Sequence, residues 1–415
     1  MERWLVALGG TLLMACLGTV YAWSVFTQPL EAAFGWSSAE TTLAFSIAIL
    51  FLGVGAVAGG RLQDRTGPRP VALAGALLWA AGNLLAGLGT ARLGAPWLYL
   101  SYGIVGGLGL GLGYVTPVAA VTKWFPDRRG VGSGVVVMGF GLGAFLYAHL
   151  LRSLPAFAAA SRRAAEVMAG GTRAPAPGLA DPVLAAFVAS GVAFAVLGGA
   201  GAALLRDPPA AQAGADAAGP QDYPPLRMVR TPQFWAAFAM LFLNVAAGIL
   251  FISNAVPIMR ELTGAAPAAA AAAYGTIALA NALGRFAWGA VSDRVGRRAA
   301  FALIYLVQVA VFLAVGRLHE VWAVAGLFAV VLLCYGGGFG VMPSLVADWF
   351  GTRHLGANYG YVLLAWAAAG LAGPGFVAWV KDHTGSYAGA LPWTAGLLAL
   401  ATAIPLATRR PGPLR

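Results

Sequence analysis

Two stretches of this chain decide its architecture because they are nearly copies of each other. Gly59–Pro70 reads GGRLQDRTGPRP, and Trp288–Ala299 reads WGAVSDRVGRRA. Asp64 and Asp293, at matching places in the two stretches, are about 229 positions apart. Each stretch follows one long apolar run and precedes another, as a short loop between two membrane helices does. The sequence therefore predicts two copies of one helical unit, produced by duplication.

A second pair of stretches supports the duplication. Lys123–Gly130 reads KWFPDRRG and Asp348–Gly356 reads DWFGTRHLG, with Trp124 and Trp349 about 225 positions apart. The offset is close to that of the first pair, so the two halves share one order of elements. Repeats of this kind place a ligand site between the two bundles, where the repeats meet.

Composition restricts the chain to the membrane. Hydrophobic residues make up 60% of the 415 residues and charged residues only 10%, far from the averages of soluble proteins. This length suits twelve spans of about 20 residues with short loops. The net charge of +11 comes from loop arginines, so we expect no nucleic-acid partner. The first apolar run is too long for a signal peptide and remains as a span.

The apolar runs predict an all-α membrane protein with twelve transmembrane helices in two pseudo-symmetric six-helix bundles. We expect bundles at residues 1–205 and 233–415, joined by a cytoplasmic linker at residues 206–232. A longer loop at 152–181 and the linker both lack the pattern of a folded domain. The predicted spans are 4–28, 41–60, 71–91, 96–117, 130–151, 182–205, 233–254, 270–291, 299–317, 321–343, 357–380 and 388–407.

The positions of Lys and Arg predict the orientation. If the amino terminus is inside, the inner segments hold 17 of the 26 basic residues and the outer segments 8, with Arg285 inside a span. Positive charge is enriched in cytoplasmic loops. We therefore expect a multi-pass protein of the cell (inner) membrane with both termini in the cytoplasm.

The loop residues have a physical logic. Gly67 and Gly296 permit a tight turn between two helices, and Pro68 suits the first turn of the second helix. Asp64 and Asp293 are placed to meet a helix amino terminus or neighbouring arginines.

These features resemble the major facilitator superfamily, whose loop between spans two and three reads GxxxDRxGxR. Several stretches resemble its oxalate–formate antiporter family and the bacterial monocarboxylate (L-lactate) transporters related to it. The resemblance implies the major facilitator fold, alternating access by rocking of the halves around a central site, and a conformational, gating role for Asp64, Arg65, Asp293 and Arg294. The stretches are YAWSVFTQPL from Tyr21, TKWFPDRRGVGSG from Thr122, RTPQFW from Arg230, NALGRFAWGAVSDRVGR from Asn281 and NYGYVLLAW from Asn358.

Arg285 is the one charged residue well inside a predicted span. It precedes Asp293 by eight residues, or about 12 Å along a helix. Burying arginine near mid-membrane costs about 2.5–3.5 kcal/mol on insertion scales, so it needs a partner. We expect a substrate carboxylate to be that partner, with backbone carbonyls or water as the alternative. Its counterpart in the first half is Ala56, which favours a site role over a scaffold role. The resemblance agrees, since related families bind the substrate carboxylate at this arginine.

Two residues depart from the pattern of the related families. Asn281 lies one turn before Arg285, where the eukaryotic monocarboxylate transporters carry Asp; it could orient the guanidinium, bond a substrate hydroxyl or join two helices. Trp366 stands where the oxalate transporters carry a Lys. One internal cation in place of two favours a monocarboxylate over oxalate.

Aromatic residues could wall the cavity or simply pack. The resemblance places Tyr114, Tyr335 and Phe339 at the substrate cavity. A tyrosine hydroxyl can bond a carboxylate while its ring excludes water. Further candidates are Tyr21, Trp23, Phe140 and Tyr361.

No enzymatic or metal chemistry is indicated. The four histidines fall at span ends or in loops and form no ligand cluster, and the GLGLG run in span four marks helix packing, since no strand precedes it. We expect no cofactor, no metal, no catalytic residue and no obligate protein partner. A membrane enzyme or receptor lacks support in the sequence.

The expected function is secondary active transport of a small monocarboxylate such as L-lactate, with a proton, across the membrane. Proton coupling follows from the resemblance alone, because every Asp and Glu lies in a loop or at a span end. The alternative is carboxylate exchange, such as oxalate for formate. Drug–proton antiport comes third, because cationic drugs usually require an internal acid.

Overall fold

The computed structural model describes residues 1–170, 175–209, 222–386 and 388–413, and every regular element within them is helical. It divides into two compact units, a first unit of Met1–Pro117 with Gly139–Arg206 and a second unit of Val118–Met138 with Asp207–Arg415. The segment 118–138 thus belongs to the second unit. The division at 1–205, 206–232 and 233–415 stays a prediction, and linker residues 210–221 lie outside the described residues.

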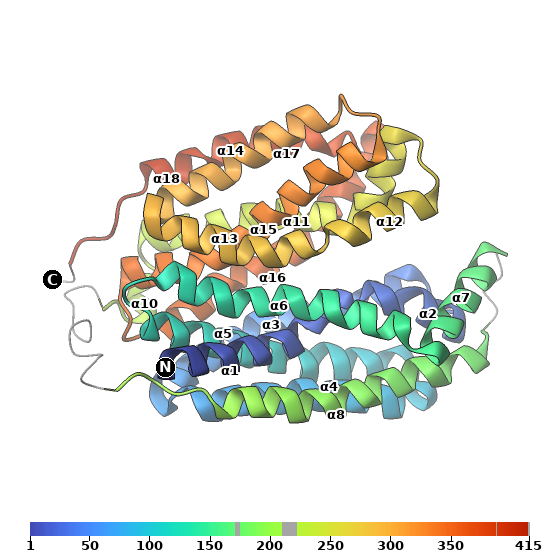
Figure 1. The fold of residues 1–415 in the computed structure, drawn as a ribbon, viewed down its shortest axis with the longest axis horizontal. Helices are drawn as coiled ribbons and strands as arrows, with labels where there is room; N and C mark the ends of the chain where they lie inside the picture. Colours follow the sequence, from blue (N-terminus) through green and yellow to red (C-terminus); the bar gives the residue numbers. More distant parts are fainter. Residues whose placement is uncertain (171–174, 210–221, 387, 414–415) are drawn as a thin grey trace. The chain divides into compact units, whose positions relative to one another are not determined.

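The first unit and the two helices that cross its boundaries are shown in blue to green in Figure 1. The elements are α1 (Glu2–Gly18), η1 (Thr19–Ala22), α2 (Ser24–Phe34), α3 (Ser38–Thr66), α4 (Pro68–Leu98), η2 (Tyr99–Gly106), α5 (Gly107–Trp124), α6 (Arg129–Ser153), α7 (Pro155–Ala169), η3 (Pro177–Leu179) and α8 (Ala180–Ala203). Of these, α4 and α8 pack along each other, as Figure 1 also shows.

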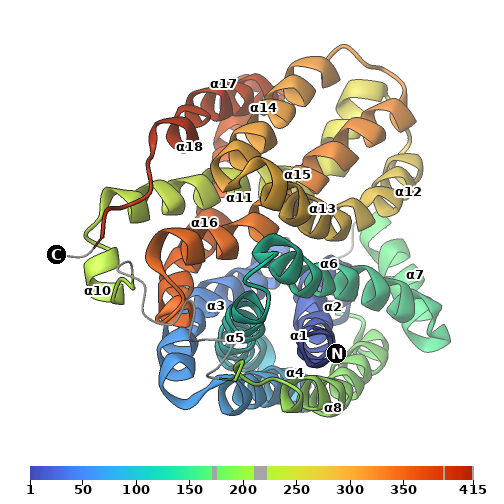
Figure 2. The same cartoon turned by 60° about the vertical axis from the view of Figure 1, so that its left-hand side comes forward.

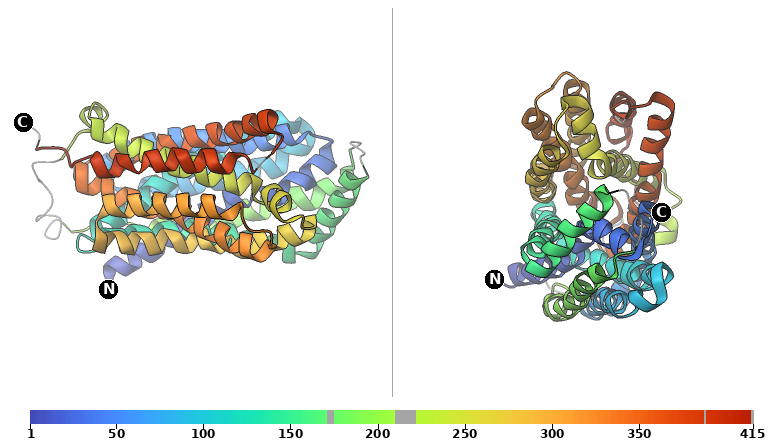
Figure 3. Two further views of the ribbon diagram at one scale, coloured as in Figure 1. Left: turned by 90° about the horizontal axis from the view of Figure 1, so that it is seen from above. Right: turned by 90° about the vertical axis from the view of Figure 1, so that its right-hand side faces the viewer.

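The second unit contains the remaining helices, drawn in yellow-green to red. Its long orange and red helices run from left to right in the left view of Figure 3 and are seen close to end-on in its right view. Their bounds are α10 (Pro225–Met228), α11 (Pro232–Thr263), α12 (Pro267–Ile277), α13 (Leu279–Val295), α14 (Arg297–Val315), α15 (Val321–Phe350), α16 (Leu355–Thr384), α17 (Ala390–Ala401) and α18 (Ala403–Ala407).

Ten helical stretches of the described chain are long and apolar enough to cross a membrane. They account for eleven of the twelve predicted spans, because the stretch Pro68–Trp124 contains two. In it, Gly94 adopts a φ of 68°, which breaks the helix where the loop between spans three and four was predicted. The remaining span, 270–291, is divided at Ala278 into α12 and α13. The all-helical, twelve-span fold class is thus confirmed.

The predicted loop at 152–181 is wrong in part, because it contains the 15-residue helix α7. Its alanine-rich sequence favours a helix, and Pro155 occupies the first turn, where proline is tolerated. Phe157, Ala160 and Ala164 are buried along one face. An apolar pattern too short for a span was therefore still enough for a packed helix.

The ends of the helices are fixed by local chemistry. Ser37 and Glu40 form a capping box at the start of α3, in which the Ser37 hydroxyl accepts from the Glu40 N–H and the Glu40 carboxylate accepts from the Ser37 N–H. In the two repeated loops, Gly67 has a φ of 83° and Gly296 a φ of 88°, as the sequence predicts. Each N–H bonds back to a carbonyl four residues earlier, which ends one helix as the next begins.

Candidate functional site

Arg285 lies on α13 with its side chain fully buried. Its Nε donates to the Oδ1 of Asn281, 3.3 Å away and one turn earlier on the same helix. The asparagine is itself buried, at 8% exposure. Asn281 therefore holds one edge of the guanidinium and sets the plane of the group.

The face of the guanidinium packs on an aromatic ring. The Arg285 Cζ lies 4.8 Å from the centre of the Phe339 ring on α15. Tyr335 meets the same ring edge-on at 5.5 Å, and Trp366 on α16 meets it at 4.8 Å. All three rings are fully buried. A cation over a desolvated ring gains about 2 kcal/mol, which offsets part of the cost of burying the arginine.

Glycines let α13 and α15 approach closely enough for these contacts. A Cβ added to Gly336 would lie 3.1 Å from the Arg285 Cγ, and one added to Gly340 would overlap the Arg285 carbonyl oxygen. Gly284 on α13 packs as tightly on the backbone at Leu333. Figure 2 shows α13 and α15 side by side. These glycines of α13 and α15 are what let Phe339 lie under the guanidinium.

Two buried polar residues that the sequence analysis did not single out support Tyr335. The Asn244 Nδ2 on α11 donates to the Tyr335 carbonyl oxygen at 3.0 Å, and the Gln308 Nε2 on α14 donates to the Asn244 Oδ1 at 3.2 Å. Asn244 and Gln308 are fully buried. Both are uncharged amides inside apolar spans, a signal that the sequence carries but that a search for charges passes over.

The other candidates form separate groups. Tyr361 lies half-buried on α16 in the second unit. In the first unit, Tyr21 and Tyr114 each meet the Phe140 ring edge-on, at 5.2 and 5.3 Å. Trp23 joins a different first-unit cluster, with Tyr102 at 4.6 Å. The structure therefore brings Asn281, Arg285, Tyr335, Phe339 and Trp366 together in the second unit, and Tyr21, Tyr114 and Phe140 together in the first.

One acid of the predicted loop between spans one and two is buried. Glu31, on α2 of the first unit, is 6% exposed and is the one buried Asp or Glu among the residues whose burial the structure describes. The Thr41 hydroxyl on α3 donates to its Oε1 at 2.9 Å. The Trp23 indole in turn donates to the Thr41 carbonyl oxygen at 3.2 Å. This acid is fixed by hydrogen bonds instead of lying free in a loop.

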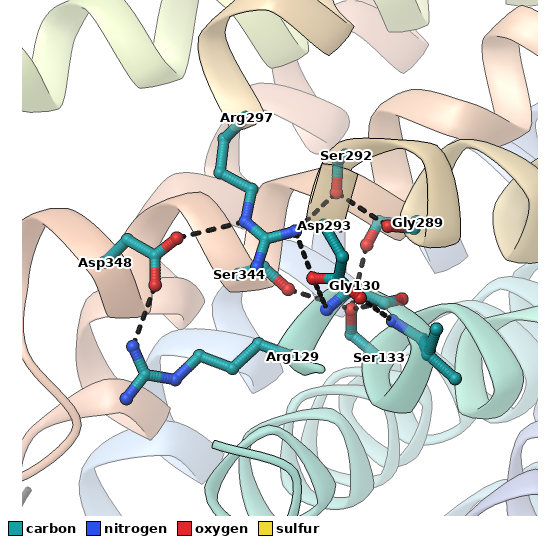
Figure 4. Close-up of polar contacts among 11 residues, drawn as sticks. Arg129, Gly130, Ser133, Gly289, Ser292, Asp293, Arg297, Ser344 and Asp348 are labelled. Carbon is teal, nitrogen blue, oxygen red and sulfur yellow. Dashed lines mark hydrogen bonds and ion pairs between the residues drawn. The ribbon is translucent and has the colours of Figure 1, made fainter. Parts of the chain in front are cut away.

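The second repeated loop joins a polar network at the end of the second unit (Figure 4). The Asp293 carboxylate accepts from the backbone N–H groups of Gly130 and Val131, each at 2.9 Å, at the amino terminus of α6. It also pairs with Arg297 at 2.5 Å. Both expected kinds of partner, a helix amino terminus and an arginine, thus meet at Asp293. Arg294 next to it is exposed.

Asp348 extends this network. Its carboxylate pairs with Arg297 at 3.0 Å and with Arg129 at 2.8 Å. Nearby, the Ser133 hydroxyl donates to the Gly340 carbonyl oxygen at 2.9 Å. In the first repeated loop, Asp64 is half-buried and Arg65 is exposed.

Metal ligands do not gather in the described part of the chain, where no three of His, Cys, Asp and Glu lie close enough to hold an ion. Cys16 and Cys334 are both buried free thiols. The chemistry available at Arg285 is recognition of an anion by charge and hydrogen bonds.

Helices in a duplicated order, with a buried arginine inside one of the spans, are typical of a membrane transporter. The sequence profile of the Major Facilitator Superfamily matches residues 8–254 and 241–415, so the chain belongs to that superfamily. The proton:xylose symporter XylE has the same fold, with a TM-score of 0.73 at 16% identity over 97% of this chain and 94% of that one.

Three named relatives show which members of the superfamily this chain resembles. The oxalate:formate antiporter of Oxalobacter formigenes is 28% identical over 92% of this chain and 86% of its own length. The apicoplast pyruvate carrier 1 of Toxoplasma gondii is 30% identical over 89% and 82%, and the monocarboxylate transporter 13 of Bos taurus is 28% identical over 92% and 84%. The chain is thus a superfamily transporter related to carboxylate carriers, as its motifs indicated.

Proposed function

We propose that this chain is a secondary active transporter that moves a small monocarboxylate, such as L-lactate or pyruvate, together with a proton across the cell membrane. Arg285 binds the carboxylate, and alternating access carries it across. Both termini lie in the cytoplasm, where the basic loops are. The Asp293 network is part of the conformational change, because it ties a repeated loop to the amino terminus of α6.

The observation that carries this proposal is the fully buried guanidinium of Arg285. A charge at this depth is costly and marks a functional site in a membrane protein. Asn281 and Phe339 fix its plane, so less conformational freedom is lost when an anion binds. A planar fork of N–H donors matches a carboxylate in two parallel hydrogen bonds.

The preference for a monoanion comes from the surroundings of the arginine. Trp366, the counterpart of the oxalate transporters' lysine, is fully buried and packs on Phe339. Arg285 is the one buried Lys or Arg among the residues whose burial is described. One cation neutralises one carboxylate, whereas a dianion would keep a second charge in an apolar region.

A second candidate is exchange of one carboxylate for another. The oxalate:formate antiporter supports it, since that relative covers most of the chain. The pyruvate carrier and the monocarboxylate transporter support the first candidate. The two functions differ in whether a proton gradient drives net movement.

The proton carrier that we propose is Glu31. Its burial and the hydrogen bond from Thr41 distinguish it from the exposed acids of the loops. Buried Asp and Glu residues of membrane transporters act as proton relays.

Transport into proteoliposomes tests the whole proposal. Labelled lactate should accumulate when the lumen is made alkaline relative to the outside, and a proton ionophore should abolish the accumulation. Uptake that requires a trapped internal carboxylate and ignores the pH gradient would establish exchange and contradict symport.

A further inference from the structure

A cleft of about 570 Å³ lies at the start of α14 in the second unit, and Arg285 is not among the residues that line it. It is lined on one side by the first turn of α14 and the end of α15, and on the other by α18 and the chain that follows it. Its charged lining residues are Arg129, Arg297, Arg298, Arg410 and Asp348.

The charges of this cleft do not balance. Arg129 and Arg297 share the Asp348 carboxylate, and Arg297 also pairs with Asp293 (Figure 4). Neither Arg298 nor Arg410 forms an ion pair within the described residues. Two carboxylates thus serve two arginines, and two further positive charges remain. The first turn of α14 adds the positive end of its helix dipole to the same place.

Hydrogen bonds hold the two sides of the cleft together. The Arg298 Nε donates to the Pro405 carbonyl oxygen at 2.7 Å, and its Nη2 donates to the Leu406 carbonyl oxygen. Both carbonyls belong to the last turn of α18, so Arg298 caps that helix. The cap fixes α18 beside the start of α14 and keeps Arg410, three residues beyond α18, at the cleft.

The remaining residues that line the cleft are apolar, and some of them are exposed on the surface of the protein. Val295 is 46% exposed and Leu406 is 60% exposed, and both line the cleft. Farther along α14, Leu303 and Leu306 are also exposed. In a membrane protein such leucines face lipid chains. The cleft therefore joins a basic pocket to a lipid-facing surface, which a small soluble anion would not require.

We propose that this cleft binds the phosphate headgroup of an anionic phospholipid. Arg298, Arg410 and the first-turn N–H groups of α14 surround the phosphate, while the acyl chains lie along the exposed leucines of α14. Basic pockets between membrane helices on the cytoplasmic side bind anionic headgroups. The lipid belongs to the leaflet on the side of the basic loops, and the site is independent of the carboxylate site at Arg285.

The test uses the purified full-length protein and native mass spectrometry with phosphatidylglycerol or phosphatidylcholine. Wild type should retain phosphatidylglycerol in preference to phosphatidylcholine. Arg410→Gln should weaken phosphatidylglycerol retention about fivefold, the effect of one basic residue near an anionic headgroup. Arg409→Gln is the matched control, since Arg409 is an exposed neighbour that does not line the cleft. It should bind as wild type does.

Equal retention by Arg410→Gln and Arg409→Gln would overturn the proposed site, and so would equal retention of the two lipids by wild type. Inorganic phosphate, added in a thermal unfolding assay, separates the two sources of a phosphate group. We expect phosphatidylglycerol to raise the unfolding temperature and phosphate at the same concentration to leave it unchanged. An equal rise with phosphate would assign the cleft to a soluble anion and contradict the lipid assignment.

Discussion

The two copies of the repeat share their backbone and differ in their charges. Both loops turn at a glycine of positive φ, Gly67 in one and Gly296 in the other. The residue after it is Pro68 in the first copy and Arg297 in the second, and only the arginine can pair with an acid. Duplication therefore kept the glycine that the turn requires, while the ionic contacts of the two copies diverged.

The same contrast extends to the second pair of stretches. Asp348, which links Arg129 and Arg297, stands where the first copy has Lys123. Within the helices, Arg285 stands where the first copy has Ala56. The first unit in turn holds the buried acid, Glu31. The second unit thus holds the buried cation that we propose to bind the carboxylate, and the first unit holds the buried acid that we propose to bind the proton.

Removing the buried cation should have the largest effect. Arg285→Ala should lower carboxylate uptake at least thirtyfold, because truncating one partner of a buried charge pair costs about 2–5 kcal/mol. Arg285→Lys should also fail or nearly so, since an ammonium cannot reproduce the planar two-bond grip. Initial rates of labelled lactate uptake in proteoliposomes measure both.

The exposed Arg317, changed to Ala, is the control for protein quality in that assay and should transport as wild type does. Full activity of Arg285→Lys would show that charge alone suffices. Full activity of Arg285→Ala would show that Arg285 does not bind the substrate, although the first copy of the repeat has Ala56 at the matching position.

Neutralising the buried acid Glu31 should abolish uptake that a pH gradient drives and leave lactate exchange intact. Glu31→Gln keeps the shape and can still accept from Thr41, but cannot take up a proton. Lactate accumulation driven by a pH gradient should disappear, whereas exchange of internal for external lactate should continue. If the gradient still drives accumulation in this variant, the proton site is elsewhere, and the assignment of proton binding to the first unit is wrong.

Adding a second cation to the second unit should alter selectivity. Trp366→Lys places an amine beside Phe339, near Arg285, where the oxalate transporters have one. Oxalate should then compete better against labelled lactate, with some loss of lactate transport because a buried ring is removed. Equal competition by oxalate in wild type and variant would show that this position does not set the choice.

The ionic contacts of the two copies should differ in their contribution to stability. Asp348→Asn leaves two partly buried arginines with a weaker partner and should lower the free energy of unfolding by about 1.5–3 kcal/mol. The Lys123–Asp207 pair of the other copy is longer, at 3.4 Å, and more exposed, so Asp207→Asn should cost about 0–1 kcal/mol. Thermal unfolding in detergent compares them. Equal losses would mean that the Asp348 network contributes no more than a surface pair.

The smallest effect is expected at the turn glycine that both copies of the repeat contain. Gly67→Ala and Gly296→Ala each force a side chain into a backbone region of positive φ and extended ψ that is nearly restricted to glycine, and should each cost about 1–2 kcal/mol. Gly316→Ala, at an ordinary φ of −65° with open space around its Cα, is the control and should be neutral. A clear difference between Gly67→Ala and Gly296→Ala in the same unfolding assay would show that the turns are not equivalent.

The class of protein, the number of spans and the position of the buried cation could all be predicted from the amino-acid sequence. Long apolar runs can satisfy their backbone in lipid only as helices, so the fold class follows from composition and periodicity. Arg285 stood out because a charge inside such a run is rare. The turn glycines were likewise predictable, since each turn demands a backbone conformation that glycine adopts most easily.

Which side chains meet depends on how the helices pack, and the sequence did not predict it. Phe339 lies under the guanidinium because glycines on α13 and α15 admit close packing, a relation between helices far apart in sequence. Glu31 read as a loop acid, and the packing of α2 and α3 buried it. Asp348 gained two arginines from segments about 50 and 220 residues away. Periodicity assigns each helix a buried face, but only packing chooses the neighbour that covers it.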